Sequence, residues 1–216
     1  MPEKKSLSQN KRNEIRADRG YRNFVATFHG LAEFLWPHTA KGCLQLPEGG
    51  CVICPNHISF ADIPVIACVF RGRLLKYMAK KELFFWPLGV LFRALGAYAV
   101  DRKNGDVGAI KTAISLCEKG YAAVIFPQGH RNPGVDPKTT KVHGGAMLVA
   151  KKANVPIIPV YIKTKDRKVR FFRKIEVFVA PPVHPESFDQ YGESNGEAMK
   201  NLFARACEME ETGKWN

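Results

Sequence analysis

From residue 51 onward, short apolar runs alternate with helical patterns. The runs CVIC (51–54), YAAVIF (121–126) and VPIIPVYIK (155–163) are typical of buried strands, whereas residues 104–120 place their apolar side chains on one helical face. Such alternation predicts an α/β domain with a mixed, largely parallel central sheet flanked by helices, because parallel neighbours need long crossover connections. The run VRFFRKIEVFVA (169–180) predicts a late, antiparallel strand.

Two prolines locate the helices between these runs. Proline is tolerated in the first turn of a helix but costs about 3 kcal/mol in its interior. Pro64 therefore predicts a helix that starts near Asp62, with the Asp62 side chain as its N-cap. Pro87 predicts a break between two short helices within residues 80–96, followed by the strand AYAVDR, and a polar final helix is expected to begin near Ser194.

Polar residues follow two of the predicted strands, in PNHISFAD (55–62) and PQGHRNPG (127–134). Open α/β sheets place their sites in loops at the carboxyl ends of parallel strands. His57 and Asp62 are close enough for the imidazole to fold back onto the carboxylate, which would leave its other nitrogen free to accept a proton. The spacing alone, however, favours a plain helix cap beside a surface histidine.

A metal site is a further interpretation of the first loop. Cys51, Cys54 and His57 spell C-x₂-C-x₂-H, but a structural zinc site needs four ligands and no second such pair occurs. Positions three apart on a strand also face opposite sides of a sheet. We therefore predict no metal site, and the six cysteines suit a reducing compartment.

The second loop has the composition of an anion site. Arg131 follows Gly129 at a turn, and a guanidinium binds phosphate through paired hydrogen bonds. Lysines and glycines lead from there into a helix whose N-terminus also attracts anions. An ordinary solvated loop accounts for these residues equally well. No glycine-rich nucleotide motif occurs, so nucleotide binding has little support.

An excess of positive charge points to an anionic partner. Lys and Arg outnumber Asp and Glu by 33 to 20, a formal charge of +13. Residues 1–40 are predicted to be a basic helical segment ahead of a domain formed by residues 41–216. Phe24, Phe28, Leu31 and Leu35 share one helical face there, which suits either the domain's own core or an anionic membrane surface.

Neither a signal peptide nor a spanning segment is expected. The first residues are too polar for an export signal, and the apolar stretch that follows has 13 residues, against about 20 for a spanning helix. Residues 163–174 carry seven basic side chains around Phe171 and Phe172. That composition suits a nucleic acid strand, a membrane-facing hairpin or a solvated turn, and without a complete nucleic-acid module we favour the last two.

Taken in order, these segments resemble the glycerolipid acyltransferase family over about residues 45–180. Four blocks carry the resemblance: NHISFAD (56–62), GAYAVDR (96–102), FPQGHRN (126–132) and VPIIPV (155–160). The resemblance implies a glycerol-3-phosphate acyltransferase-like fold, with His57 as general base and Asp62 as the carboxylate that orients it. It also implies a substrate-binding role for six further residues: Asn56, Lys80, Arg102, Gln128, Gly129 and Arg131.

The third block departs from the family pattern at three positions. Gln128 stands for the usual Glu, His130 for Thr and Asn132 for Ser. The lost carboxylate affects which acceptor binds, although a glutamine amide can still bond a glycerol hydroxyl.

The activity implied by the resemblance is transfer of a fatty acyl group to lysophosphatidate. The donor would be acyl-CoA or acyl-carrier protein, with no other cofactor, and the enzyme would lie peripherally (monotopically) on the cytoplasmic face of an anionic membrane. The apolar residues 83–92 would border the acyl groove, contact lipid or belong to the core. Alternatives are a related enzyme with another lysolipid acceptor, or a non-catalytic basic protein that binds membrane or nucleic acid; no nucleic acid partner is expected.

Overall fold

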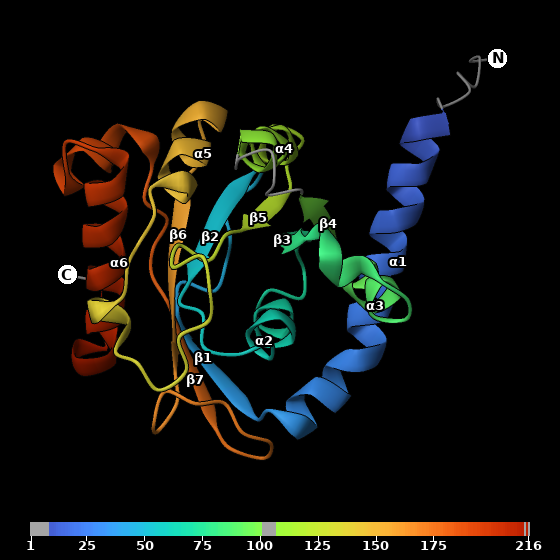
Figure 1. Ribbon diagram of the computed structural model, residues 1–216, viewed down its shortest axis with the longest axis horizontal. Helices are drawn as coiled ribbons and strands as arrows, with labels where there is room; N and C mark the ends of the chain where they lie inside the picture. The colour runs from blue at the N-terminus through green and yellow to red at the C-terminus, as the bar shows by residue number, and fades with distance from the viewer. Residues whose placement is uncertain (1–8, 101–106, 214, 216) are drawn as a thin grey trace.

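A seven-stranded sheet forms the centre of the computed structural model, which describes residues 9–100, 107–213 and 215 (Figure 1). The strand order is β1-β7-β6-β2-β5-β3-β4, and neighbours are parallel except for the antiparallel pair β6 and β7. The strands are β1 (His38–Gly42), β2 (Cys51–Pro55), β3 (Leu75–Lys80), β4 (Ala97–Val100), β5 (Ala122–Val124), β6 (Ile157–Lys163) and β7 (Ile175–Val179). The predicted mixed, largely parallel sheet is confirmed.

Helices cover both faces of the sheet. They are α1 (Gln9–Leu35), α2 (Asp62–Val69), α3 (Leu88–Ala94), α4 (Val107–Glu118), α5 (Gly145–Ala153) and α6 (Asn195–Thr212), with short 3₁₀ turns η1 (Lys81–Phe84), η3 (Pro137–Thr139) and η4 (Pro185–Tyr191). The helices α4, α5 and α6 pack on one face, and α1 and α2 pack on the other, with α3 against α1 and β4 (Figure 1). No helix in the described part of the chain has the length and apolarity needed to cross a bilayer.

Strand β2 shows why the central strands are continuous apolar runs. Val52 and Cys54 belong to the core on the α5 side, and Cys51 and Ile53 to the core on the α2 side. A parallel strand covered on both faces has no polar side to alternate with. Cys51 and Cys54 therefore point away from one another, and burial raises the pKa of Cys51 to about 11 and that of Cys54 as well. Neither thiol favours the thiolate form that zinc binds.

The helix that carries Pro64 begins at Asp62, as predicted, but the predicted N-cap is wrong. Ala61 occupies the cap position and makes no side-chain cap bond. The Asp62 carboxylate turns back into the preceding loop instead, where the backbone N–H groups of Ile58 and Ser59 donate to it at 2.7 and 2.8 Å. In the loop, two backbone N–H groups and the His57 imidazole bind the carboxylate. These bonds take the place of a cap bond from the free N–H groups at the start of the helix. Ser194 does cap the last helix, as its Oγ accepts from the backbone of Glu197.

Several features of the fold differ from the predicted pattern. Helix α1 ends at Leu35, and β1 (His38–Gly42) crosses the predicted division at residue 40 and pairs with β7. The pattern predicted neither β1 nor β3, because polar side chains interrupt the apolar residues of both strands, HTAKG and LKYMAK. Residues 169–174 form a turn rather than the first half of a strand, with φ of 60° at Phe172.

Candidate active site

The two polar loops meet at the carboxyl ends of β2 and β5, which are parallel neighbours. The backbone N–H of His57 donates to Gln128 Oε1 at 2.6 Å, and the backbone N–H of Asn132 donates to the His57 carbonyl at 2.8 Å. These two bonds join segments that lie more than 70 residues apart in the chain. The two loops that the sequence singled out are therefore in contact.

His57 folds back onto Asp62, as the spacing allowed. Their Nδ1 and Oδ2 atoms lie 2.7 Å apart, and the Asp62 side chain is fully buried. A carboxylate oxygen that accepts three hydrogen bonds requires Nδ1 to be the protonated nitrogen. The other nitrogen, Nε2, is then the one that can accept a proton. The cap-and-bystander interpretation is wrong for this pair.

Phe126 sets the plane of the imidazole. Its ring stacks on that of His57 with the centroids 3.9 Å apart and the planes inclined by 20°. Together with the bond to Asp62, this stacking leaves the His57 side chain little rotational freedom and 15% exposed. A base held in one orientation loses little entropy when a substrate arrives.

A cavity of about 370 Å³ opens over this pair. Its walls come from the two loops and from the ends of β3 and β4, and Ile63 of α2 and Phe92 of α3 complete them. Arg131 lies at its rim, with its guanidinium stacked 3.7 Å from the centre of the Phe60 ring. The stacking holds a permanently charged fork beside the histidine.

Gln128 does not face this cavity, so the predicted bond from its amide to a substrate hydroxyl finds no support. The residue is completely buried. Its Oε1 accepts from the His57 backbone, and its Nε2 donates to Thr140 Oγ1 at 2.7 Å. The Thr140 hydroxyl in turn donates to the Pro137 carbonyl at 2.7 Å. Gln128 thus supports the loop that carries the histidine.

The Asn56 side chain also makes hydrogen bonds within the protein. It is 1% exposed, its Nδ2 donates to the Ile162 carbonyl at 3.0 Å, and its Oδ1 accepts from the Ile162 N–H at 2.6 Å. The side chain therefore continues the β2–β6 ladder one residue past the end of β2. These bonds give Asn56 a structural role, and the substrate contact expected of it stays a prediction.

Three residues of the predicted site remain: Gly129, Lys80 and Arg102. Gly129 lines the cavity with φ of 74°, a backbone conformation that other residues rarely adopt, so the turn before Arg131 requires glycine. Lys80 ends β3, whose residues Met78 and Ala79 line the cavity. Arg102 lies outside the described residues.

Three residues of the site were missed by sequence reasoning. Phe126 and Phe60 lie inside the two polar blocks, where an aromatic next to a candidate base or guanidinium could have been noticed as a stacking partner. Thr140 carries no comparable signal, because its role depends on the fold of the turn around Pro137.

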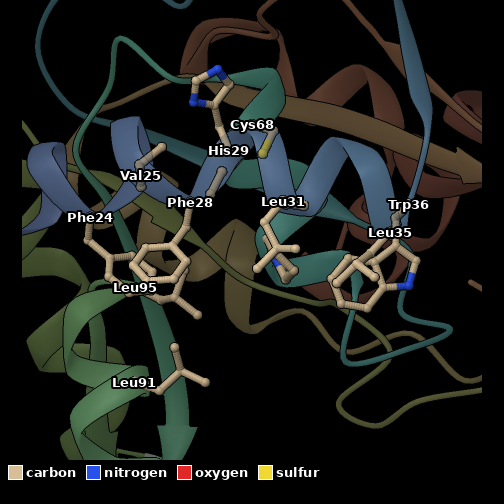
Figure 2. Close-up of a pocket in the computed structure, with 13 residues that line it drawn as sticks. Phe24, Val25, Phe28, His29, Leu31, Leu35, Trp36, Cys68, Leu91 and Leu95 are labelled. Carbon is tan, nitrogen blue, oxygen red and sulfur yellow. The ribbon is translucent and has the colours of Figure 1, made fainter.

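A second cavity, of about 350 Å³, lies between α1, α2 and α3 and is almost wholly apolar. Figure 2 shows Phe24 and Phe28 of α1 directed toward Leu91 of α3 and Leu95 just after it. The predicted apolar stripe of α1 therefore lines a cavity; Tyr21 of α1 is buried in the core, and Val25 both lines the cavity and belongs to the core.

Side chains of residues 83–92 lie in three different environments. Phe92 is buried and lines the cavity that His57 lines, whereas Leu91 lines the apolar one. Phe85 and Trp86 are 57% and 84% exposed. Helix α3 thus separates the two cavities, with large apolar side chains on the surface just before it.

Comparisons with known proteins agree with this arrangement. The sequence matches the family described as Acyltransferase over residues 38–163, more than half of the chain. It is 29% identical over 145 residues to the 1-acyl-sn-glycerol-3-phosphate acyltransferase of Bacillus subtilis, covering 65% of this chain and 70% of that one. The enzyme of the same name from Streptococcus pneumoniae is 28% identical over 218 residues, covering 94% and 80%.

A solved structure shares the fold. The 1-acyl-sn-glycerophosphate acyltransferase of Thermotoga maritima superposes with a TM-score of 0.67 at 22% identity, covering 97% of this chain and 86% of that one. The fold and the family match define an α/β enzyme, whose histidine–carboxylate pair lies at the carboxyl ends of its parallel strands. The chain belongs to the acyltransferase family and is an O-acyltransferase.

Proposed function

We propose that this acyltransferase moves a fatty acyl group from an acyl thioester, acyl-CoA or acyl-carrier protein, to the free hydroxyl of lysophosphatidate, giving phosphatidate. The relatives named above carry that acceptor in their names. The observation that carries the proposal is the His57–Asp62 contact of 2.7 Å at the floor of a cavity whose rim holds Arg131.

The chemistry needs one base and no covalent intermediate on the protein. His57 Nε2 takes the proton of the acceptor hydroxyl as its oxygen attacks the thioester carbonyl carbon. The imidazolium that forms is stabilised by the buried carboxylate of Asp62. When the tetrahedral intermediate collapses, the C–S bond breaks and the imidazolium returns the proton to the leaving thiolate.

Arg131 would bind the phosphate of the acceptor. Its guanidinium is at the cavity rim and is held over Phe60, so its donors can pair with phosphate oxygens while the ring limits its movement. Gly129 allows the loop to turn and present that side chain. Lys80, at the end of β3, and Arg102 are proposed as further cations of the same phosphate site, as the family resemblance implies.

The apolar cavity between α1, α2 and α3 would accept a lipid acyl chain. Ile63 of α2 lines the catalytic cavity while Pro64 lines the apolar one, so one helix borders both. A cavity of about 350 Å³ with an almost wholly apolar lining gains from hydrocarbon and has little to offer a headgroup.

A lipid acceptor and product place the enzyme at a membrane. We propose that the basic segment of residues 1–40 docks the domain of residues 41–216 peripherally on the anionic cytoplasmic face. The large apolar side chains exposed on α1 and next to α3 support this docking: Phe28, Leu31, Phe34, Phe85, Trp86 and Val90.

A different lysolipid acceptor is the second candidate, and His130 favours it. This residue lines the catalytic cavity at the position where the family usually has Thr, so its ring changes the wall that an acceptor meets. An acceptor panel with one acyl-CoA donor separates the two. Lysophosphatidate should give the highest kcat/KM; a higher value for a lysolipid with a larger headgroup would favour the second candidate.

Arg131→Ala tests the phosphate contact on the same panel. It should raise the KM for lysophosphatidate at least about tenfold, since a charged hydrogen bond contributes about 1.5–3 kcal/mol, and leave the KM for acyl-CoA nearly unchanged. Arg131→Lys keeps the charge without the paired donors and should recover part of the loss. Equal increases for donor and acceptor would contradict the assignment.

A further inference from the structure

The turn of residues 164–174, which joins β6 to β7, carries basic and aromatic side chains that the acyl-transfer site does not use. We propose that this basic–aromatic turn is a second membrane-docking element, which binds the surface of a bilayer containing anionic phospholipid. The inference rests on the proposed function only in that a lipid substrate gives the enzyme a reason to dock.

The turn lies at the edge of the sheet where the catalytic loops lie. It leaves the carboxyl end of β6, which neighbours β2. The Gly134 N–H donates to the Arg167 carbonyl at 2.8 Å, and the Arg167 guanidinium pairs with Asp136 at 3.1 Å. A membrane surface that contacts the turn therefore also lies close to the loop that follows Arg131.

The turn is also joined to the end of α1. The backbone N–H of Phe172 donates to the Leu35 carbonyl at 2.7 Å, and that of Ile175 donates to the Pro37 carbonyl at 2.8 Å. In Figure 1 the turn between β6 and β7 and the carboxyl end of α1 lie next to one another at the lower edge. The two elements thus present one continuous surface.

Aromatic rings from both elements form an exposed cluster on that surface. Phe34 and Phe172 pack edge to face with centroids 5.3 Å apart, and Trp36 stacks on Phe171 at 5.4 Å. Phe34, Phe171 and Phe172 are each about 60% exposed or more, at 66%, 59% and 61%. Phe172 holds this place with φ of 60°, which is rare for a bulky residue. A ring held outward at a conformational cost suits a partner that covers it.

Cations surround these rings. A surface cavity of about 580 Å³ is lined by residues of the turn, with five basic side chains: Lys165, Lys168, Arg170, Arg173 and Lys174. Asp166 is the one carboxylate among its described lining residues, and it is paired with Arg170 at 2.5 Å. The buried hydroxyl of Thr164 also lines it and has no hydrogen-bond partner among the described residues. Several cations that lie together suit phosphate oxygens.

The arrangement of the rings favours a bilayer over a nucleic acid strand. Stacking of successive bases needs separate open ring faces along a groove. Here the rings pack against one another and form one apolar cluster bordered by cations, the pattern of an interfacial anchor beside anionic headgroups.

Vesicle binding of the whole purified chain tests the proposal. The variant Lys165→Gln/Arg173→Gln/Lys174→Gln is compared with Lys111→Gln/Lys152→Gln/Lys200→Gln, which removes the same charge from exposed positions on α4, α5 and α6. Each cation near an anionic surface contributes about 1 kcal/mol, so the first variant should bind phosphatidylcholine–phosphatidylglycerol vesicles on the order of 100-fold more weakly. The control should lose only a small fraction of that.

A second variant tests the aromatic cluster. Phe171→Ser/Phe172→Asn keeps a residue that tolerates the left-handed conformation at 172, and it should weaken binding to neutral and anionic vesicles alike. Binding is measured without acyl donor, so a chain that transferred no acyl group to any acceptor would still give these results. Equal losses in the two triple variants would overturn the proposal, as would unchanged vesicle binding together with lost binding of a single-stranded oligonucleotide.

Discussion

Gln128→Met separates a role in positioning His57 from a role in binding the acceptor. Methionine has a similar length but neither accepts from the His57 backbone nor donates to Thr140, so the variant removes both bonds of the buried amide. The cavity wall is unchanged, because Gln128 does not line it.

The structure sets the size of the effect. The His57 N–H loses its acceptor in a part-buried position, which costs about 1–3 kcal/mol, whereas the Thr140 hydroxyl keeps its bond to the Pro137 carbonyl. For a chain of this length the melting temperature should fall by about 2–10 °C. A base displaced by even a fraction of an ångström loses rate, and we expect kcat to fall about 10- to 100-fold.

Steady-state kinetics with both substrates, together with thermal unfolding, measures these effects. Thr140→Val is the matched control: it removes the second bond of the amide and leaves the bond from His57 to Gln128 intact. It should lower the melting temperature by a similar amount and reduce kcat much less. The reasoning is refuted if Gln128→Met raises the KM for lysophosphatidate while kcat is kept, because that result assigns Gln128 to the acceptor.

Two further substitutions test other parts of the site. Asp62→Asn should keep the loop bonds from Ile58 and Ser59, because the amide oxygen can accept them. It should lower kcat about 100-fold with little change in KM, since the imidazolium loses its counter-charge. Steady-state rates measure this effect, and an unchanged kcat would contradict it. Asn56→Leu should lower the free energy of unfolding by about 2–5 kcal/mol, because both backbone groups of Ile162 lose their partner. Urea titrations measure this loss. An unchanged urea midpoint would show that the β2–β6 ladder does not need this side chain.

The buried strands and the start of the helix at Asp62 could be predicted because their signals are local, and the spacing of His57 and Asp62 allowed their contact without favouring it. The unbroken apolar run at 51–54 reflects a strand covered on both faces, and Pro64 admits only a helix that begins near Asp62. Once the start of that helix is placed, the loop between His57 and Asp62 is short enough to bring the two side chains together.

What could not be predicted depends on contacts between distant segments. The partners of Gln128 are His57, 71 residues before it, and Thr140, 12 residues after it, and no local pattern records either. For that reason the glutamine in place of the usual family glutamate suggested a change of acceptor, although it supports the loop of the histidine. The edge strand β1 was missed because it gains its regular structure only by pairing with β7.

The central claim is that His57 is the base for acyl transfer, and the rate of His57→Ala on acyl-CoA and lysophosphatidate tests it most directly. The backbone bond to Gln128 remains in this variant, so its circular dichroism spectrum and cooperative unfolding should stay close to those of the unmodified chain. Loss of a general base lowers the rate by about 10²–10⁴, and we expect kcat/KM to fall at least that far. A folded His57→Ala variant with nearly full activity would contradict the account.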